Sequence, residues 1–263
     1  MKTESEQAQP RQGRATTRVV KIGGSQLRDP SDLEALARHV RREVDAGIHV
    51  VVVHGGGPEI KSMHDRLGVT SETRDGLRVT NEQTLEIATM VLCGAVNPRL
   101  VGQLVAHGVR AIGLSGIDAG LLRADLLDEP RLGRVGDRPR VATPFLRSML
   151  TQGMVPVVAP LAIGPDGRPL NVNADTAAHA IAAALKADSL DFVSDVRGVR
   201  SRGGLVRHLT RRDALDLIRD AVVVGGMVPK LHAAIAALET GVSRVRVGDL
   251  QSVAQGTATE MVA

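Results

Sequence analysis

The sequence is poor in aromatic side chains and in cysteine. Its 263 residues include no Trp, no Tyr, two Phe and a single cysteine, Cys93. One cysteine can form neither an internal disulfide nor a thiolate metal cluster, which favours a cytoplasmic protein. Without aromatics the chain lacks the stacking platforms on which single-stranded nucleic acids bind. We therefore expect no nucleic-acid partner, although the pI is near 9.8.

Long apolar runs are also missing. No run approaches the roughly 18 apolar residues that span a bilayer, and residues 1–18 lack the apolar core of a signal peptide. We expect no membrane association. The apolar fraction of 43% and the charged fraction of 24% are typical of a globular chain. Residues 1–17 are polar and are predicted to form a disordered tail.

From Arg18 onward, short apolar runs alternate with helical patterns. This alternation is typical of an α/β protein with a mainly parallel sheet. The predicted strands are Arg18–Ile22, His49–Val53, Ala111–Leu114, Val155–Leu161, Asp191–Ser194 and, as the last, Arg244–Val247. Residues 123–141 indicate a hairpin and loop. Helices are expected to begin at a capping box of Ser31 and Glu34, at Asn97-Pro98 and at Thr210.

Glycines cluster after predicted strands at Gly23-Gly24 and Gly55–Gly57, and after a loop at Gly225-Gly226. At the carboxyl end of a parallel strand, glycines let backbone N–H groups converge on an anion. A tight turn without a ligand is the alternative. The P-loop and dinucleotide-binding glycine patterns are both absent, so any phosphate is bound by another scheme.

Two lysines lie beside these glycine turns. Only five of the 33 basic residues are lysine, and Lys21 precedes Gly23 while Lys230 follows Gly226. A lysine is suited to following a migrating phosphoryl group because its charge is compact and its stem flexible. A solvated surface lysine is the alternative at each position.

Two further segments carry polar side chains next to predicted helices. In Asn171–Asp175, the carboxylate of Asp175 could cap a helix, but two amides and a carboxylate at alternate positions also favour a binding role. Arg78 could clamp a carboxylate with its planar fork, although a lone arginine is ordinarily a surface residue.

Seven segments together resemble the N-acetylglutamate kinases of the amino acid kinase family. They appear in the order of that family and cover about residues 18–263: Val19–Gly24, His54–Ile60, Gly76–Thr80, Gly113–Gly116, Asn171–Asp175, Ser194–Val196 and Gly225–Lys230. The resemblance implies an open αβα sandwich of two lobes. Residues 18–175 would bind the amino acid and residues 176–263 the nucleotide. The reaction would be ATP-dependent phosphorylation of the γ-carboxylate of N-acetyl-L-glutamate, the second step of arginine biosynthesis.

The resemblance also implies roles for individual residues. Lys21 and Lys230 would stabilise the transition state, and Asp175 would hold both ammonium groups. Gly56, Gly57, Arg78 and Asn171 would bind the amino acid, whereas Gly23, Gly24, Ser194, Asp195 and Gly198 would bind the nucleotide. Mg²⁺ would arrive with ATP and be held mainly by its phosphates, without a dedicated protein site.

Some features favour other members of the same fold. Ile117 stands where many N-acetylglutamate kinases carry lysine, and Met90–Val101 resembles kinases that act on aminoadipate linked to a carrier protein. A non-catalytic, nucleotide-binding member is a further alternative. The polar tail also lacks the apolar N-terminal helix of hexameric, arginine-inhibited members. We therefore expect a homodimer that arginine does not inhibit.

Overall fold

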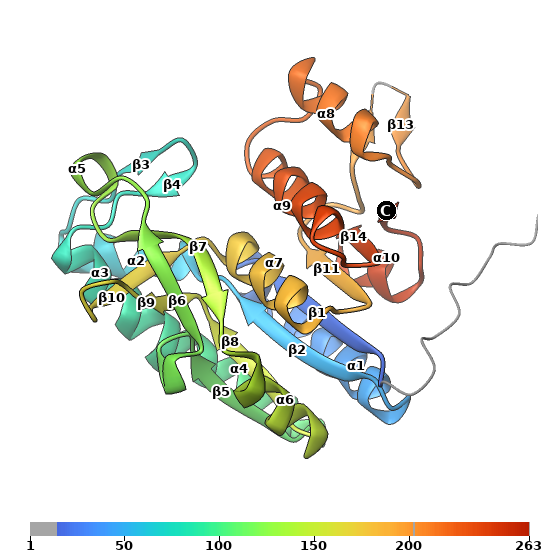
Figure 1. Ribbon diagram of the computed structural model, residues 1–263, viewed down its shortest axis with the longest axis horizontal. Helices are drawn as coiled ribbons and strands as arrows, with labels where there is room; N and C mark the ends of the chain where they lie inside the picture. Colours follow the sequence, from blue (N-terminus) through green and yellow to red (C-terminus); the bar gives the residue numbers. More distant parts are fainter. Residues whose placement is uncertain (1–14, 202, 263) are drawn as a thin grey trace, which may run out of the picture.

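A seven-stranded sheet runs through the centre of the computed structural model, which describes residues 15–201 and 203–262 (Figure 1). Six strands are parallel, and the edge strand β15 is antiparallel to its neighbour β14. In spatial order the strands are β15 (Thr259–Val262), β14 (Arg244–Gly248), β11 (Ser189–Val193), β1 (Thr17–Ile22), β2 (His49–His54), β8 (Val155–Ala159) and β5 (Ala111–Ser115).

Both faces of this sheet are buried, which explains why its strands are rich in valine. Successive residues of a strand point to opposite faces. Val19 and Val51 lie in one apolar core, and Val20, Val50 and Val52 lie in the other. Helices cover each face, and the protein is therefore a three-layer αβα sandwich, as predicted.

The helices divide between the two cores. Those that contribute buried residues to the core of Val19 are α6 (Thr143–Thr151), α7 (Ala174–Leu185), α8 (Arg211–Arg219) and α9 (Met227–Glu239). Those that contribute to the core of Val20 are α1 (Pro30–Asp45), α2 (Gly57–Leu67), α3 (Glu82–Thr89), α4 (Asn97–Ala106) and α10 (Leu250–Ala254).

A second, small sheet closes on itself beside the first. It contains β10 (Pro169–Val172), β7 (Val135–Val141), β6 (Leu122–Leu126) and β9 (Leu161–Ile163). β6 and β7 are antiparallel, which confirms the hairpin expected at 123–141. The remaining elements are short: β3 (Thr73–Arg74), β4 (Leu77–Arg78), α5 (Glu129–Leu132), β12 (Arg200–Ser201), β13 (Gly204–Leu205) and the 3₁₀ turns η1 (Ser25–Leu27) and η3 (Asp118–Gly120).

Three local predictions were wrong. α1 is capped by the Asp29 side chain, which accepts from the N–H of Ser31 at 2.8 Å, so Ser31 is not its cap. Pro160 separates β8 from β9 and divides the strand predicted over Val155–Leu161, because proline donates no ladder hydrogen bond. The strand at Arg244 is not the last, since β15 pairs with it. The helix start predicted at Thr210 is confirmed, and Thr210 forms a capping box with Asp213.

α4 begins at Asn97 with Pro98 in its first turn, as predicted, but it does not begin a separate helix. The chain stays helical from Glu82 to Ala106. A π-helical segment, η2 (Met90–Val96), joins α3 to α4. Proline inside a helix removes a hydrogen bond, and the wider π turn is a known way to accommodate such a break.

This continuous helix is also long and apolar enough to cross a membrane, with 44% of its most apolar window buried inside the protein. One such helix is weak evidence for a span, because core helices pass the same test. Leu92, Val96, Leu100 and Leu104 do pack in the core of Val20.

The structure tests only part of the predicted division into a tail and two lobes. Residues 1–14 of the tail lie outside the described residues, whereas Thr17 already belongs to β1. The boundary between residues 175 and 176 falls in the first turn of α7. The division into two lobes stays a prediction, since one continuous sheet contains strands from both.

Candidate active site

Lys21, Asp175 and Lys230 converge at the carboxyl end of the central sheet. Lys21 is the penultimate residue of β1, between Val53 of β2 and Phe192 of β11. The Asp175 carboxylate lies 2.7 Å from the Lys21 Nζ and 3.5 Å from the Lys230 Nζ. One buried carboxylate thus holds two ammonium groups that come from distant parts of the chain.

The charges in this cluster depend on one another. Burial lowers the pKa of the Lys21 ammonium, the Asp175 carboxylate opposes that shift, and the positive charge of Lys230 adds to it. Lys21 and Asp175 are each only 5% exposed. Removing Asp175 would leave two cations facing each other with little water to screen them.

The cap of α7 is not Asp175. The Asn173 Oδ1 accepts from the N–H of Asp175 at 2.8 Å and from that of Thr176 at 3.3 Å. Asp175 is thereby released from capping, and the capping interpretation of this residue is wrong.

Two glycine turns meet backbone to backbone beside the charged cluster. A Cβ on Gly24 would lie 2.7 Å from the Pro58 Cδ, 3.1 Å from the Gly57 nitrogen and 3.2 Å from the Gly56 Cα. α2 follows directly, and none of the described side chains caps it. Its first N–H groups are therefore available to an anion. At the third glycine pair, Lys230 donates to the Gly226 carbonyl at 3.4 Å.

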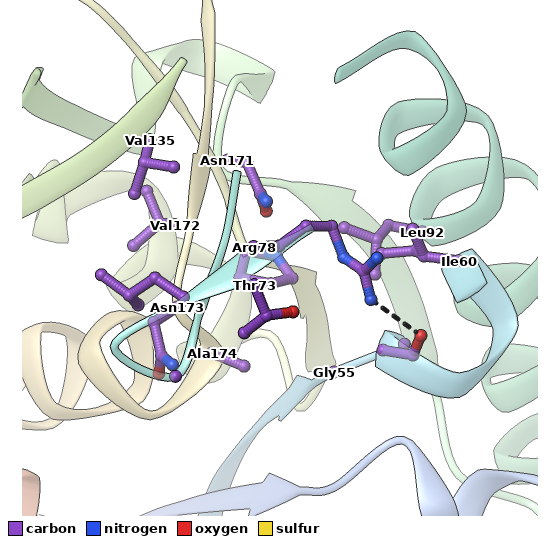
Figure 2. Close-up of a pocket in the computed structure, with 15 residues that line it drawn as sticks. Gly55, Ile60, Thr73, Arg78, Leu92, Val135, Asn171, Val172, Asn173 and Ala174 are labelled. Carbon is purple, nitrogen blue, oxygen red and sulfur yellow. Dashed lines mark hydrogen bonds between the residues drawn. The ribbon is translucent and has the colours of Figure 1, made fainter. Parts of the chain in front are cut away.

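A cavity of about 230 Å³ opens next to the second glycine turn (Figure 2). Gly55–Gly57 line one side, and Asn171 and Asn173 line another. Arg78, at the end of β4, reaches across and donates to the Gly57 carbonyl at 3.2 Å and to the Ser71 hydroxyl. Burial lowers the pKa of Arg78, but a guanidinium stays charged in proteins. Asn171 donates to the Thr80 hydroxyl at 3.1 Å. This cavity therefore combines a cation, amides and backbone donors.

The residues expected to bind the nucleotide are more dispersed. Ser194 and Asp195 follow β11 and line a separate cavity of about 310 Å³. The Ser194 hydroxyl finds no hydrogen-bond partner among the described residues. Gly23 donates to the Val193 carbonyl at 3.2 Å, in the turn after β1. Gly198 lies against β15, where a Cβ would be 2.5 Å from the Thr259 Oγ1, and this packing alone explains the glycine.

Within residues 15–201 and 203–262, no three His, Cys, Asp or Glu side chains come together as a metal site. The Asp175 carboxylate is already engaged by two lysines. A divalent cation bound here would depend on oxygen ligands supplied by a substrate.

The sequence and the fold both match known proteins. The model of the amino acid kinase family matches residues 16–249. The chain belongs to the amino acid kinase family. An acetylglutamate kinase of Roseiflexus sp. (strain RS-1) is 46% identical over 246 residues, 92% of this chain and 92% of that protein. An acetylglutamate kinase of Bacillus subtilis (strain 168) is 42% identical over 88% of this chain and 89% of that protein.

A crystal structure of a protein from Streptococcus mutans UA159 superposes on this amino acid kinase with a TM-score of 0.86. The two chains are 30% identical, and the match covers 94% of this chain and 98% of the other. The expected family and fold are thus both confirmed.

Some residues of this amino acid kinase site carry no signal in the sequence. Leu92 and Val135 line the first cavity, yet nothing in the sequence distinguishes either of them from an ordinary core residue. Thr80 appears in the sequence only as the end of the segment Gly76–Thr80, although its hydroxyl accepts a hydrogen bond from Asn171. Such residues are brought to the site by tertiary packing, which periodicity does not reveal.

The contact between the two glycine turns leads to the first prediction. We expect Gly24→Ala to push the turns apart and to lower both the melting temperature and the phosphoryl-transfer rate. Gly203→Ala is the matched control, because a Cβ there meets only the Ser201 Oγ, at 3.8 Å. Thermal unfolding and steady-state kinetics measure the two effects. Equal behaviour of both variants would contradict the close approach.

Proposed function

We propose that this amino acid kinase phosphorylates the γ-carboxylate of N-acetyl-L-glutamate with ATP, the second step of arginine biosynthesis, in the cytoplasm. The observation that carries the proposal is the Lys21–Asp175–Lys230 cluster beside two glycine turns. It is supported by curated relatives named acetylglutamate kinase, which are 42% and 46% identical over about nine tenths of the chain.

The chemistry needs charge stabilisation rather than proton transfer. A γ-carboxylate oxygen attacks the γ-phosphorus of ATP, the bond to the β,γ-bridging oxygen breaks, and ADP leaves with that electron pair. A general base is unnecessary because the carboxylate is already ionised at pH 7. Lys21 and Lys230 would stabilise the charge on the transferring and leaving phosphate oxygens, and Asp175 would keep both ammonium groups in place.

The cavity beside Arg78 would bind the amino acid, and the cavity beside Ser194 would bind ATP. Arg78 and Asn171 would bind the carboxylate and polar groups of the amino acid, with the N–H groups of Gly56 and Gly57. Residues 18–175 would thus form the amino-acid lobe and residues 176–263 most of the nucleotide lobe. For ATP, the binding residues would be Gly23, Gly24, Ser194, Asp195 and Gly198. Mg²⁺ would neutralise phosphate charge and be held by ATP and water.

The proposed roles of the cations can be separated kinetically. We expect Lys21→Ala and Lys230→Ala each to lower kcat roughly 10²-fold or more, with a smaller effect on KM, because their contacts strengthen as charge develops. Arg78→Ala should instead raise KM for the amino acid by about ten- to a hundredfold. Near-normal kcat in Lys230→Ala would contradict its assigned role.

The acceptor is tested by comparing substrates on the purified protein. We expect ADP release with N-acetyl-L-glutamate, and little with glutamate or with aminoadipate linked to a carrier protein. Turnover only with the carrier-linked substrate would identify the alternative kinase, to which Ile117 and Met90–Val101 also bear resemblance. Absence of turnover with all three would favour a non-catalytic nucleotide-binding protein.

We also propose that the protein is a homodimer. β5 is an edge strand of the central sheet, and exposed edges tend to pair with another chain. α4 packs alongside it, and the continuous helix from Glu82 to Ala106, of which α4 is the last part, presents an uncharged stripe in which Met90 is 51% exposed and Val105 is 53% exposed. A two-fold axis beside β5 would bury both features on each copy.

Substitution of this stripe tests the dimer. The wild-type protein should sediment at twice 27.7 kDa, whereas Met90→Glu combined with Val105→Glu should shift the mass toward one chain by burying charge in the interface. Leu215→Glu on α8, at a residue 39% exposed, is the control. A hexameric mass together with inhibition by micromolar arginine would refute both the dimer and the expected insensitivity.

A further inference from the structure

His54 is a fully buried histidine at the end of β2, directly before the glycine turn. The mechanism proposed above gives this residue no role. Its exposed fraction is 0%. The ring nitrogen Nδ1 lies 2.9 Å from the Gly55 carbonyl oxygen, and Nε2 lies 3.0 Å from the Asn97 amide nitrogen. Both ring nitrogens are thus engaged, one of them by the turn itself.

The contacts of Asn97 decide which ring nitrogen carries the proton. Its Nδ2 lies 2.9 Å from the Val157 carbonyl oxygen and 3.4 Å from that of Leu114. Carbonyl oxygens only accept hydrogen bonds, so the amide nitrogen must face them and must also donate to the His54 Nε2. The proton then resides on Nδ1, which donates to the Gly55 carbonyl. Burial lowers the pKa of His54 to about 4, and the ring is neutral near pH 7.

This hydrogen bond fixes the one peptide between two anchored groups: the Gly55 N–H donates to the Ile22 carbonyl at 3.0 Å, and the Gly56 carbonyl accepts from the Ile60 N–H at 2.9 Å. Three successive glycines leave the backbone with wide conformational freedom. In a trans peptide the carbonyl and the following N–H point in opposite directions. With the Gly55 carbonyl held against His54, the N–H of Gly56 is directed away from the ring. The Leu92 side chain packs against the Gly56 Cα, since a Cβ on Gly56 would lie 2.7 Å from the Leu92 Cδ2.

The surrounding chain makes room for this arrangement. Asn97 is only 5% exposed and stands at the start of α4, directly after the π-helical segment. A Cβ on Gly113 of β5 would lie 2.1 Å from the Asn97 Oδ1. The amide therefore fits only because the neighbouring strand carries a glycine there.

We propose that His54 and Asn97 are positioning residues, which fix the Gly55–Gly56 peptide so that the Gly56 N–H faces the oxygen of the bound acyl amino acid. The proposal rests on the phosphoryl transfer described above. It extends the site to a second layer: Asn97 sets the tautomer of His54, His54 sets the peptide plane, and the peptide presents the N–H to the substrate.

Kinetics of His54 variants test this role against a matched control. In His54→Leu we expect kcat to fall roughly ten- to a hundredfold and KM for the acceptor to rise, because the N–H is misplaced, while KM for ATP is unchanged. His54→Asn keeps an amide donor near the position of Nδ1 and should restore most of the loss.

His64→Leu is the control. His64 is equally buried and is likewise bonded through both ring nitrogens, to the Ile60 carbonyl at 2.8 Å and the Thr84 hydroxyl at 3.2 Å. The contacts of His64 lie within and between helices. The His64→Leu variant should therefore be less stable than the wild type but should not show the fall in kcat expected for His54→Leu. Equal kcat per folded molecule in the two leucine variants would overturn the proposal.

The histidine tautomer gives a readout independent of turnover. In ¹⁵N-histidine-labelled wild-type protein near pH 7, the resonance absent from His54→Asn should show the proton on Nδ1. In Asn97→Leu, which removes the donor to Nε2, the proton should redistribute toward Nε2. A wild-type His54 protonated on Nε2 would overturn the proposal even if a leucine variant failed to fold. If acetylglutamate were not turned over, the proposed function would fail, and the spectrum would still decide the tautomer.

Discussion

The site depends on one buried carboxylate between two ammonium groups. Lys21 lies on a central strand, and Lys230 lies in the first turn of α9. Among residues 15–201 and 203–262, only Asp175 forms an ion pair with both. Burial of a lone lysine favours its neutral form, and a second lysine nearby adds to that tendency. The carboxylate offsets both effects. In the proposed mechanism, the charge needed for phosphoryl transfer would therefore be maintained by a residue that does not itself react.

Around this cluster, the protein uses backbone rather than side chains. Gly24 and Gly56 approach so closely that a methyl group on Gly24 would separate the two turns. Backbone donors occupy little space and carry no flexible stem, which suits a site where a small anion must be held from several directions. Their weakness is conformational freedom, and the contact from His54 to the Gly55 carbonyl restricts that freedom.

The helix from Glu82 to Ala106 links the site to the surface. Its inner face carries Leu92 and Asn97, which contact the second glycine turn and the histidine before it. Its outer face carries Met90 and Val105.

The sequence by itself determined the layered α/β fold, because valine-rich strands and amphipathic helices follow from local periodicity. It also singled out Lys21 and Lys230 through their place beside glycine turns, and Asp175 through the polar segment Asn171–Asp175. Only the tertiary structure decided that Asn173 caps α7 and frees Asp175, and that the chain remains helical through Asn97. The His54–Asn97 contact joins residues 43 positions apart in the chain. Such outcomes depend on packing between segments that are distant in the sequence, and the local sequence pattern carries no information about that packing.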